Sequence, residues 1–270
     1  MNPTWQSEEP PEMPQIDAAG WVRALLRGIV LGVVVYGGLA VFLLIRLFEW
    51  PFGRPVTPWI TQGVCKASFA ILGIGFRWRG RPMTARGAVV ANHASWLDIF
   101  ALNAAQRIFF VSKAEVRGWP GIGPLARATG TVFIERDRRH ASAQKTIFED
   151  RLRRGDKLLF FPEGTSTDST RVLPFKSTLF QAFFAPEIVE FMHVQPVTVV
   201  YHAPRGADPR FYGWWGDMDF GRHLLKVLAA PLQGEVEVVF HTPVRVAEFP
   251  HRKALTLYCE ARVREGMDLE

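Results

Sequence analysis

The chain has 270 residues, which is enough for one substantial domain with a short appendage and too short for two full catalytic domains. Hydrophobic residues make up 48% of it and aromatic residues 13%, so the composition excludes a largely disordered chain. The formal net charge is +6 at pH 7, and this basic balance fits an anionic membrane surface, an anionic substrate, an acidic carrier or nucleic acid.

The first segment, residues 1–20, differs from the rest of the chain in charge. It contains four acidic residues and no Lys or Arg, so the remaining chain carries a net charge of +10. Pro10, Pro11 and Pro14 prevent a helix there. We therefore predict a flexible acidic tail over residues 1–20.

Two apolar stretches follow, separated by a turn that is rich in Pro and Gly. Residues 28–45 carry no charge and are flanked by Arg residues, and this length is near the lower limit for crossing a bilayer. Residues 57–76 are apolar except at two positions. The pattern predicts a membrane-associated helical hairpin over residues 21–79. The alternative is that one or both stretches are core helices of the domain that follows.

Beyond residue 80, short β-rich runs alternate with amphipathic stretches. This alternation predicts one α/β domain over residues 80–270, with a mixed, mostly buried sheet flanked by helices. A helix is expected after Ser95, and apolar positions at helical spacing predict helices over 141–154 and 252–264. The expected strands cover residues 89–91, 108–112, 131–134, 158–161, 194–201 and 236–240.

Cysteine and histidine spacing argues against a metal site. Cys65 and Cys259 are the only cysteines, and they lie far apart in apolar settings, which favours a reducing compartment without disulfides. The seven histidines lack the short paired spacing on a helix that zinc hydrolases use. We predict no metal bound by these residues.

One segment, NHASWLD at residues 92–98, places an imidazole and a carboxylate at an expected strand-to-helix junction. If Asp98 accepts a hydrogen bond from one ring nitrogen of His93, the other nitrogen stays unprotonated and can remove a proton from an alcohol. Ser95 lies nearby, but the chain has no G-x-S-x-G elbow. We therefore expect Ser95 to be a loop hydrogen-bonder and the acceptor hydroxyl to attack the acyl group directly. Backbone amides near this turn are expected to stabilise the oxyanion.

A His-x4-Asp pair alone is a weak indication, and three further segments in a fixed order strengthen it. They are GTVFIER at residues 130–136, FPEGT at 161–165 and VQPV at 194–197. Together with NHASWLD they resemble the four motifs NHxSxxD, GxxFIxR, FPEGTxS and VxPV of the PlsC-type glycerophospholipid acyltransferase family. The resemblance covers about residues 87–200 and implies a glycerol-3-phosphate acyltransferase-like fold.

The resemblance also implies roles for individual residues. It makes His93 and Asp98 the catalytic pair. Arg136 can also be argued from its chemistry, because a guanidinium grips two oxygens of an anionic group; the alternative is a solvated basic turn with Arg138 and Arg139. For one acidic position, Glu163, a structural role in its turn is nearly as well supported as acceptor binding. The implied substrate-binding residues are Gly130, Arg136, Glu163, Gly164, Thr165, Lys176 and Pro196.

The sequence departs from the phosphatidic-acid-forming enzymes in its third segment, which lacks their Arg after Gly-Thr. The family pattern Phe-Lys-x-Gly is FKST here, at residues 175–178. These features, with WWGDM at 214–218, resemble the branch that acylates lyso-ornithine lipid. An amino-acid head group needs fewer phosphate-binding cations, and Asp217 and Asp219 could meet its ammonium group. Arg171 could instead replace the missing Arg.

The expected function is therefore O-acyl transfer from acyl-ACP or acyl-CoA to the hydroxyl of a membrane lysolipid, with no cofactor besides the thioester. The catalytic domain is expected on the cytoplasmic face of the inner membrane, because the thioester donors are made there. The alternative acceptor is 1-acyl-sn-glycerol-3-phosphate. A soluble thioesterase would need neither Arg136 nor the hairpin, and a non-catalytic membrane-tethered lipid-binding protein would not need His93. Nucleic-acid binding is disfavoured, because the Arg residues are not interleaved with aromatic residues in a known module.

Overall fold

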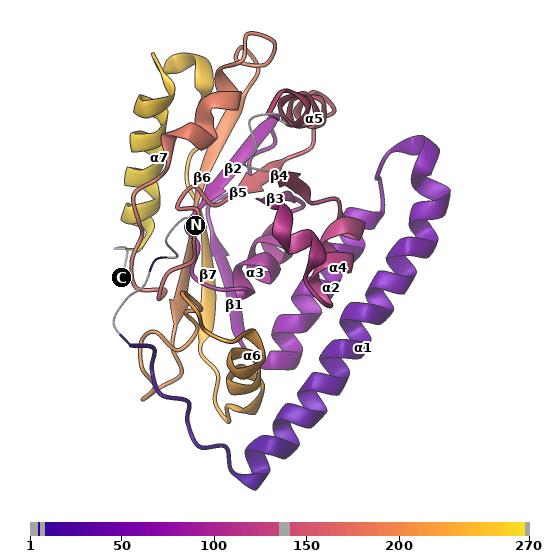
Figure 1. The fold of residues 1–270 in the computed structure, drawn as a ribbon, viewed down its shortest axis with the longest axis vertical. Coiled ribbons are helices and arrows are strands. Elements are labelled where there is room, and N and C mark those ends of the chain that lie inside the picture. Colours follow the sequence, from indigo (N-terminus) through magenta and orange to yellow (C-terminus); the bar gives the residue numbers. More distant parts are fainter. Residues whose placement is uncertain (1–4, 6–8, 135–140, 268–270) are drawn as a thin grey trace.

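The structure is a computed structural model that describes residues 5, 9–134 and 141–267, with the backbone alone at residues 141–145. A central sheet lies between two layers of helices, with α1 and α2 on one side and α7 on the other (Figure 1). This architecture confirms the predicted α/β fold. The helices are α1 (Ala18–Glu49), α2 (Thr57–Leu72), α3 (Leu97–Ala105), α4 (Ile122–Thr129), α5 (Ala141–Arg153), α6 (Phe220–Ala229) and α7 (Arg252–Met267).

The sheet is mixed, as expected. Its strand order is β1-β7-β6-β2-β5-β3-β4, with β8 pairing to β6. β6, β2, β5, β3 and β4 run parallel, whereas β7 is antiparallel to β6 and carries β1 parallel to itself. The strands are β1 (Gly75–Arg79), β2 (Gly87–Ala91), β3 (Phe109–Lys113), β4 (Val132–Ile134), β5 (Leu158–Phe160), β6 (His193–His202), β7 (Glu235–Phe240) and β8 (Val244–Arg245).

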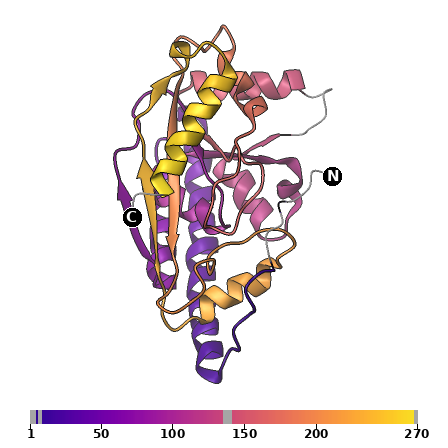
Figure 2. The same cartoon turned by 90° about the vertical axis from the view of Figure 1, so that its left-hand side faces the viewer.

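The two sheet faces are buried in separate hydrophobic cores. Val89 and Ala91 of β2 face the core shared with α2, α3 and α6, whereas Ala88 and Val90 face the core shared with α5 and α7. Successive side chains of a strand point to opposite faces, so a strand between two helical layers is apolar throughout. β2 is accordingly buried at all of its positions. Figure 2 looks from the α7 side, with α7 in front of the sheet and α1 behind it.

The parallel strands also determine where a site can form. The carboxyl ends of β2, β3 and β5 meet at one edge of the sheet, and β6 passes the same edge. Loops that follow parallel strands gather at such an edge and form the ligand pocket of open α/β folds. The loop after β2 carries the NHASWLD segment, and the loop after β5 carries the FPEGT segment.

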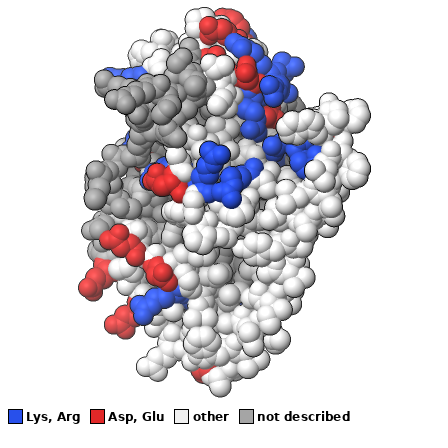
Figure 3. Space-filling model, turned by 45° about the vertical axis from the view of Figure 1, so that its right-hand side comes forward, with Lys and Arg blue, Asp and Glu red and all other residues white. Residues whose placement is uncertain are grey.

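The two helices of the predicted hairpin differ in exposure. Residues 18–52 are long and apolar enough to cross a membrane, and only 6% of their most apolar window is buried. By contrast, α2 buries Cys65, Phe69 and Leu72 in the core beneath the sheet. Figure 3 shows a broad surface without charged side chains on the side of the molecule where α1 lies. α2 is therefore a core helix of the domain, and α1 carries the exposed apolar face.

The sheet of the domain begins before residue 80. α2 ends at Leu72, and Gly73 caps it with a positive φ of 77°, which a glycine adopts without steric cost. Residues Gly75–Arg79 then form β1, which pairs with β7 at the edge of the sheet. The predicted apolar stretch 57–76 thus contains both a helix and the start of a strand.

The N-terminal segment forms no helix or strand over residues 9–16, in keeping with its prolines. Asp17 caps α1, because its Oδ1 accepts a hydrogen bond of 2.6 Å from the Gly20 amide. Trp5 packs against Trp215, with ring centroids 6.4 Å apart. The prediction of a flexible tail did not anticipate this contact with the domain.

Candidate active site

The structure brings His93 and Asp98 together at the turn between β2 and α3. Nδ1 of His93 lies 2.7 Å from Oδ2 of Asp98. The same Oδ2 accepts hydrogen bonds from the amides of Ala94 and Ser95, at 2.8 and 3.0 Å. A carboxylate only accepts, so Nδ1 carries the proton and Nε2 is left as the basic nitrogen. Asp98 is completely buried, whereas 20% of the His93 side chain is exposed.

Tyr201 completes the surroundings of Asp98, and the sequence analysis missed it. Its hydroxyl donates a hydrogen bond of 2.7 Å to Oδ1 of Asp98. Burial and the neighbouring Asp98 charge raise the pKa of Tyr201 well above its usual value, so the hydroxyl stays protonated and remains a donor. The residue lies on β6, four positions after the VQPV segment, and is the aromatic residue of the run VTVVY at residues 197–201.

The turn at residues 92–98, which carries the candidate catalytic pair, is called the catalytic turn below. Aromatic stacking and hydrogen bonds to a neighbouring strand fix its orientation. The His93 ring stacks on Phe161 with centroids 4.0 Å apart and an interplanar angle of 11°. Asn92 joins β2 to β6, because its side-chain amide donates to the Val199 carbonyl at 2.9 Å and accepts from the Val199 amide at 2.7 Å. Neither partner is close in sequence, so both contacts depend on the sheet.

Glu163 lies beneath the catalytic turn with 1% of its surface exposed. Its Oε1 accepts from the His93 amide and its Oε2 from the Leu173 amide, each at 2.6 Å. Burial raises the pKa of Glu163 to about 8, and the two amide hydrogen bonds oppose that shift. Both carboxyl oxygens are thus used within the protein. The geometry gives Glu163 the structural role that the sequence left open beside acceptor binding.

Three amides of the turn are already occupied, so these three are not available as the oxyanion donors that the sequence led us to expect near this turn. His93 N donates to Glu163, and Ala94 N and Ser95 N donate to Asp98. Ser95 also differs from its expected role, because its Oγ is buried without a hydrogen-bond partner in the part of the chain that the structure describes. Oxyanion donors must therefore come from other residues.

The rest of the third segment supports the same turn. Thr167 donates to the His93 carbonyl from both its amide, at 2.9 Å, and its hydroxyl, at 3.2 Å. Gly164 has a φ of +74°, and a Cβ there would lie 2.6 Å from Nζ of Lys176. Lys176 is exposed beside this loop, and Thr165 is partly exposed. These two side chains are therefore accessible from solvent at the site.

The second segment is described only in part. Gly130 caps α4 with a φ of +86°, and a Cβ there would overlap the guanidinium of Arg54. Its carbonyl accepts a hydrogen bond of 3.1 Å from Arg151. Gly130 is buried, so it shapes the chain before β4. Arg136 lies outside the described residues, and its role in acceptor binding stays a prediction.

Pro196 lies in the middle of the central strand β6, opposite Val90 of β2. On its other side, β6 pairs with β8 up to Val194 and with β7 from Val197. Pro196 therefore falls at the change of partner, where its missing N–H costs no ladder hydrogen bond. Its carbonyl accepts from the His241 amide at 3.1 Å. The structure places it in the sheet beneath the catalytic turn.

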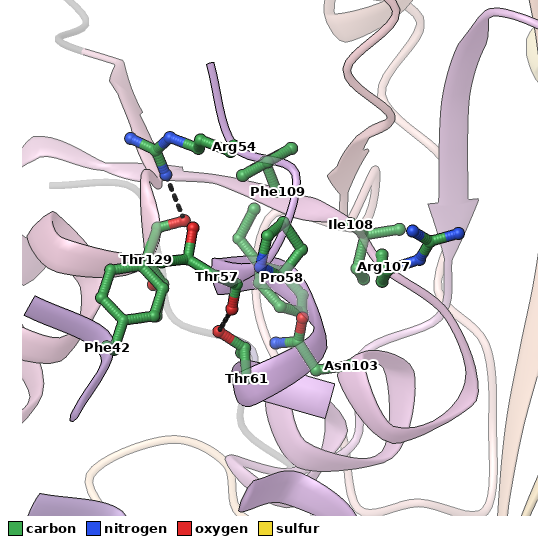
Figure 4. Close-up of a pocket in the computed structure, with 11 residues that line it drawn as sticks. Phe42, Arg54, Thr57, Pro58, Thr61, Asn103, Arg107, Ile108, Phe109 and Thr129 are labelled. Carbon is green, nitrogen blue, oxygen red and sulfur yellow. Dashed lines mark hydrogen bonds between the residues drawn. The ribbon is translucent and has the colours of Figure 1, made fainter. Parts of the chain in front are cut away.

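A small cavity of about 10 Å³ lies near the start of α2, between residues such as Phe42, Pro58 and Phe110 (Figure 4). Such a volume holds about one water molecule and cannot hold a substrate. Phe110 stacks on Phe161 at 6.0 Å, and Phe161 stacks on His93. Within the described residues, no group of three or more His, Cys, Asp or Glu side chains could hold a metal ion.

The fold and the site place a histidine–aspartate pair at the carboxyl ends of parallel strands, an arrangement that can act as a general base on a hydroxyl group. A family model described as Acyltransferase matches residues 79–200, which include all four segments. The chain is 57% identical over 268 residues to a lyso-ornithine lipid O-acyltransferase of Rhodobacter capsulatus, covering 98% of this chain and 97% of that one. The chain belongs to the acyltransferase family and is an acyltransferase.

Two further proteins are similar to this chain, one in part of its sequence and one in its fold. A 1-acyl-sn-glycerol-3-phosphate acyltransferase of Neisseria gonorrhoeae is 40% identical over 120 residues, or 43% of this chain and 47% of that one. The crystal structure of PlsC from Thermotoga maritima, a 1-acyl-sn-glycerophosphate acyltransferase, superposes with a TM-score of 0.67. It is 23% identical and covers 92% of this chain and 95% of its own. The structural likeness establishes the fold.

Proposed function

We propose that the enzyme transfers a fatty acyl group from a carrier thioester to the free hydroxyl of lyso-ornithine lipid. The observation that supports this acceptor is the 57% identity, over nearly the whole of both chains, to a relative with that name. The pair of His93 and the buried Asp98 can act as the base that such a transfer needs.

In the proposed reaction, Nε2 of His93 takes the proton of the acceptor hydroxyl while its oxygen attacks the thioester carbonyl carbon. Asp98 stabilises the imidazolium that forms, and Tyr201 holds Asp98 in place. The tetrahedral intermediate collapses by breaking the carbon–sulfur bond, and His93 returns the proton to the thiolate. The products are an ester and a free thiol, and no residue of the enzyme is acylated. No metal or further cofactor takes part in this scheme.

The second candidate acceptor is 1-acyl-sn-glycerol-3-phosphate, which the Neisseria gonorrhoeae relative favours. Its phosphate would need cations near the third segment. Arg171, which could replace the missing family Arg, is paired with the buried Asp168, with Nη2 and Oδ2 2.9 Å apart. This pairing neutralises the cation and argues for an acceptor without a phosphate.

The proposal places the enzyme at the inner membrane, with the catalytic edge of the sheet toward the cytoplasm. The exposed apolar face of α1 supports membrane association. The donors are acyl-ACP or acyl-CoA, both of which carry the acyl group on a thiol.

The test is acyl transfer by the purified protein in detergent, with lyso-ornithine lipid and 1-acylglycerol-3-phosphate supplied in parallel. We expect a preference for lyso-ornithine lipid and transfer by His93→Ala that is slower by on the order of a hundredfold or more. A preference for the phosphate acceptor would replace the proposed acceptor by the second candidate. Free fatty acid as the main product would instead indicate a thioesterase.

A further inference from the structure

Two tryptophans from different loops meet beside the catalytic turn. Trp119 follows β3, and Trp214 lies in the loop between β6 and α6. β3 ends at the edge of the sheet that carries His93, whereas β6 continues past this edge and the loop after it folds back to it. The amide of Trp214 donates a hydrogen bond of 2.9 Å to the carbonyl of Ala94, the residue after His93.

The two indole rings form an edge-to-face pair. Their centroids lie 6.5 Å apart with an interplanar angle of 89°. Trp119 is 40% exposed and Trp214 is partly exposed, so solvent reaches both rings. A second edge contact, to Phe220 at 6.1 Å, supports Trp214 from the side of α6.

Contacts within its own loop hold the Trp214 ring in position. Nε1 donates to the Met218 carbonyl at 2.9 Å, which closes the loop on itself. Gly216 has a φ of +59°, which allows this tight return. Since the N–H is already used, what remains for a ligand is the π face of the ring. Asp217, which is exposed in the same loop, adds negative charge nearby.

These features fit a cation and disfavour an anion. The electron-rich faces of indoles attract an ammonium group, and Trp is the side chain that does so most strongly. In lyso-ornithine lipid, nine bonds separate the reacting hydroxyl oxygen from the terminal nitrogen of the ornithine, a reach of about 11 Å when extended. An acceptor whose hydroxyl lies at His93 can therefore place its ammonium group in the loop of Trp214.

We propose that Trp119 and Trp214 form the subsite that binds the ammonium group of the acceptor head group. The inference rests on the proposed function, because it assumes an acceptor that carries an amine. It makes the two tryptophans determinants of acceptor specificity and leaves proton transfer to His93. A neutral head group would lose the attraction and would be acylated less efficiently.

The competing role for Trp119 is attachment to the membrane, since tryptophans favour the bilayer interface. Trp119 is close to α1, because a Cβ at nearby Gly121 would lie 2.8 Å from the hydroxyl of Tyr36. An anchoring tryptophan would affect every lipid acceptor equally. A head-group subsite would affect only acceptors that carry the positive charge.

The experiment compares kcat/KM for lyso-ornithine lipid and for the same lipid with its side-chain amine acetylated. Both are presented in identical detergent micelles. The full-length enzyme should prefer the charged acceptor by roughly five- to thirtyfold, as expected for a desolvated cation–π contact. Trp119→Leu and Trp214→Leu should each bring this ratio toward 1, and Trp214→Phe should restore part of it. The ratio cancels any general loss of activity.

The matched control is Trp78→Leu, because Trp78 is 51% exposed on the edge strand β1, away from the catalytic turn. It should retain the wild-type ratio. A ratio of kcat/KM values that stays at the wild-type level in both tryptophan variants would overturn the inference. If that unchanged ratio comes with weaker binding to phosphatidylglycerol vesicles, the tryptophans attach the enzyme to the membrane instead. If the wild-type enzyme acylates neither amine-bearing nor acetylated acceptor but does acylate 1-acylglycerol-3-phosphate, the proposed function itself fails.

Discussion

Asp98 accepts hydrogen bonds from His93, from two backbone amides and from Tyr201, all with donor–acceptor distances of 3.0 Å or less. Four donors around one buried carboxylate leave it little freedom to rotate. The face of the His93 ring packs against Phe161. As the proposed base, His93 is therefore preorganised before any substrate binds, which lowers the reorganisation needed in the transition state.

Replacing His93 by Ala should reduce kcat by on the order of 10²- to 10⁴-fold, the usual contribution of a general base. The fold should persist, because His93 lies at the mouth of the site rather than in either core. His193→Ala is the matched control, since His193 begins β6 at the opposite edge of the sheet. Comparable activity of the two variants in the transfer assay would exclude His93 as the base.

Tyr201→Phe removes one donor from Asp98 and keeps the ring volume. Asp98 is then held by one hydrogen bond fewer, so it orients Nδ1 of His93 less firmly. We expect kcat to fall severalfold while the fold persists. Tyr258→Phe, on α7, serves as the control. Wild-type kcat in Tyr201→Phe would mean that the orientation of Asp98 does not depend on this hydrogen bond.

Glu163 makes a prediction about stability and pH. Its pKa is about 8 in the folded protein and 4.5 as an ordinary carboxyl, so the folded state binds this proton more tightly. The stability that the neutral form contributes is complete below pH 4.5 and is lost as the pH rises toward 8. Between pH 4.5 and pH 8, the melting temperature of the wild type should therefore fall relative to that of Glu163→Gln, which cannot ionise at this position. Glu187→Gln, at an exposed site, should show no such slope.

Among the helices, the contact between α1 and α2 depends on a single small residue. A Cβ at Gly38 would lie 2.5 Å from Cγ2 of Val64 on α2, whereas a Cβ at Gly37 would have no neighbour within 4 Å. Small residues allow two helix backbones to approach closely. The two adjacent glycines thus provide a matched pair for testing how tightly the helices pack.

Gly38→Val should force α1 away from α2 and destabilise the protein, because overpacking costs about 1–3 kcal/mol. For a chain of this size the melting temperature should fall by about 2–10 °C. Gly37→Val should have little effect. Thermal unfolding in detergent measures both variants. Equal shifts would mean that the helices separate easily in solution.

Strands and helices with a strong pattern of hydrophobic residues were predictable from the sequence, and those with a weak hydrophobic pattern were not. The expected strands 194–201 and 236–240 are found as His193–His202 and Glu235–Phe240, because both are rich in valine and buried almost throughout. α4 was missed because Gly123 and Pro124 interrupt an already short helix. β1 was missed because it is a short, largely exposed edge strand, GFRWR, in which two arginines interrupt the apolar residues.

The candidate site was predictable where it is local in sequence. His93 and Asp98 are five residues apart, and one turn suffices to join them. Tyr201 reaches Asp98 across 103 positions, through the pairing of Ala91 with Val197 between β2 and β6. Strand order decides that contact, and no local pattern encodes it. For the same reason the sequence could not show that the turn amides are occupied.

Considered as a whole, the molecule has one face made by α1 that is fixed relative to the active site. Nη1 of Arg27 donates to the carbonyls of Leu228 and Ala230, at 3.1 and 2.8 Å, and ties α1 to the end of α6. α6 in turn follows the loop of Trp214 beside the catalytic turn. A membrane that binds α1 would therefore hold the catalytic edge in a defined orientation.

Leu44→Glu should weaken binding to vesicles, because Leu44 is 61% exposed on the apolar face of α1. Placing a charge in the apolar region of a bilayer costs up to about 3 kcal/mol, so partitioning should fall by about tenfold or more. Leu257→Glu is the control, since Leu257 is 67% exposed on α7, across the sheet. Vesicle flotation measures both. Equal binding by the two variants would remove α1 as the membrane-binding face.

The loop of Trp214 is joined to the catalytic turn by a main-chain hydrogen bond, from the Trp214 amide to the Ala94 carbonyl. Any residue other than proline can make that bond, so evolution can replace the side chains of the loop without disturbing the base. Related enzymes could thus acquire new acceptors by changing the segment between β6 and α6 while inheriting NHASWLD intact. Exchanging residues 213–219 between two such enzymes would be a direct way to transplant acceptor preference.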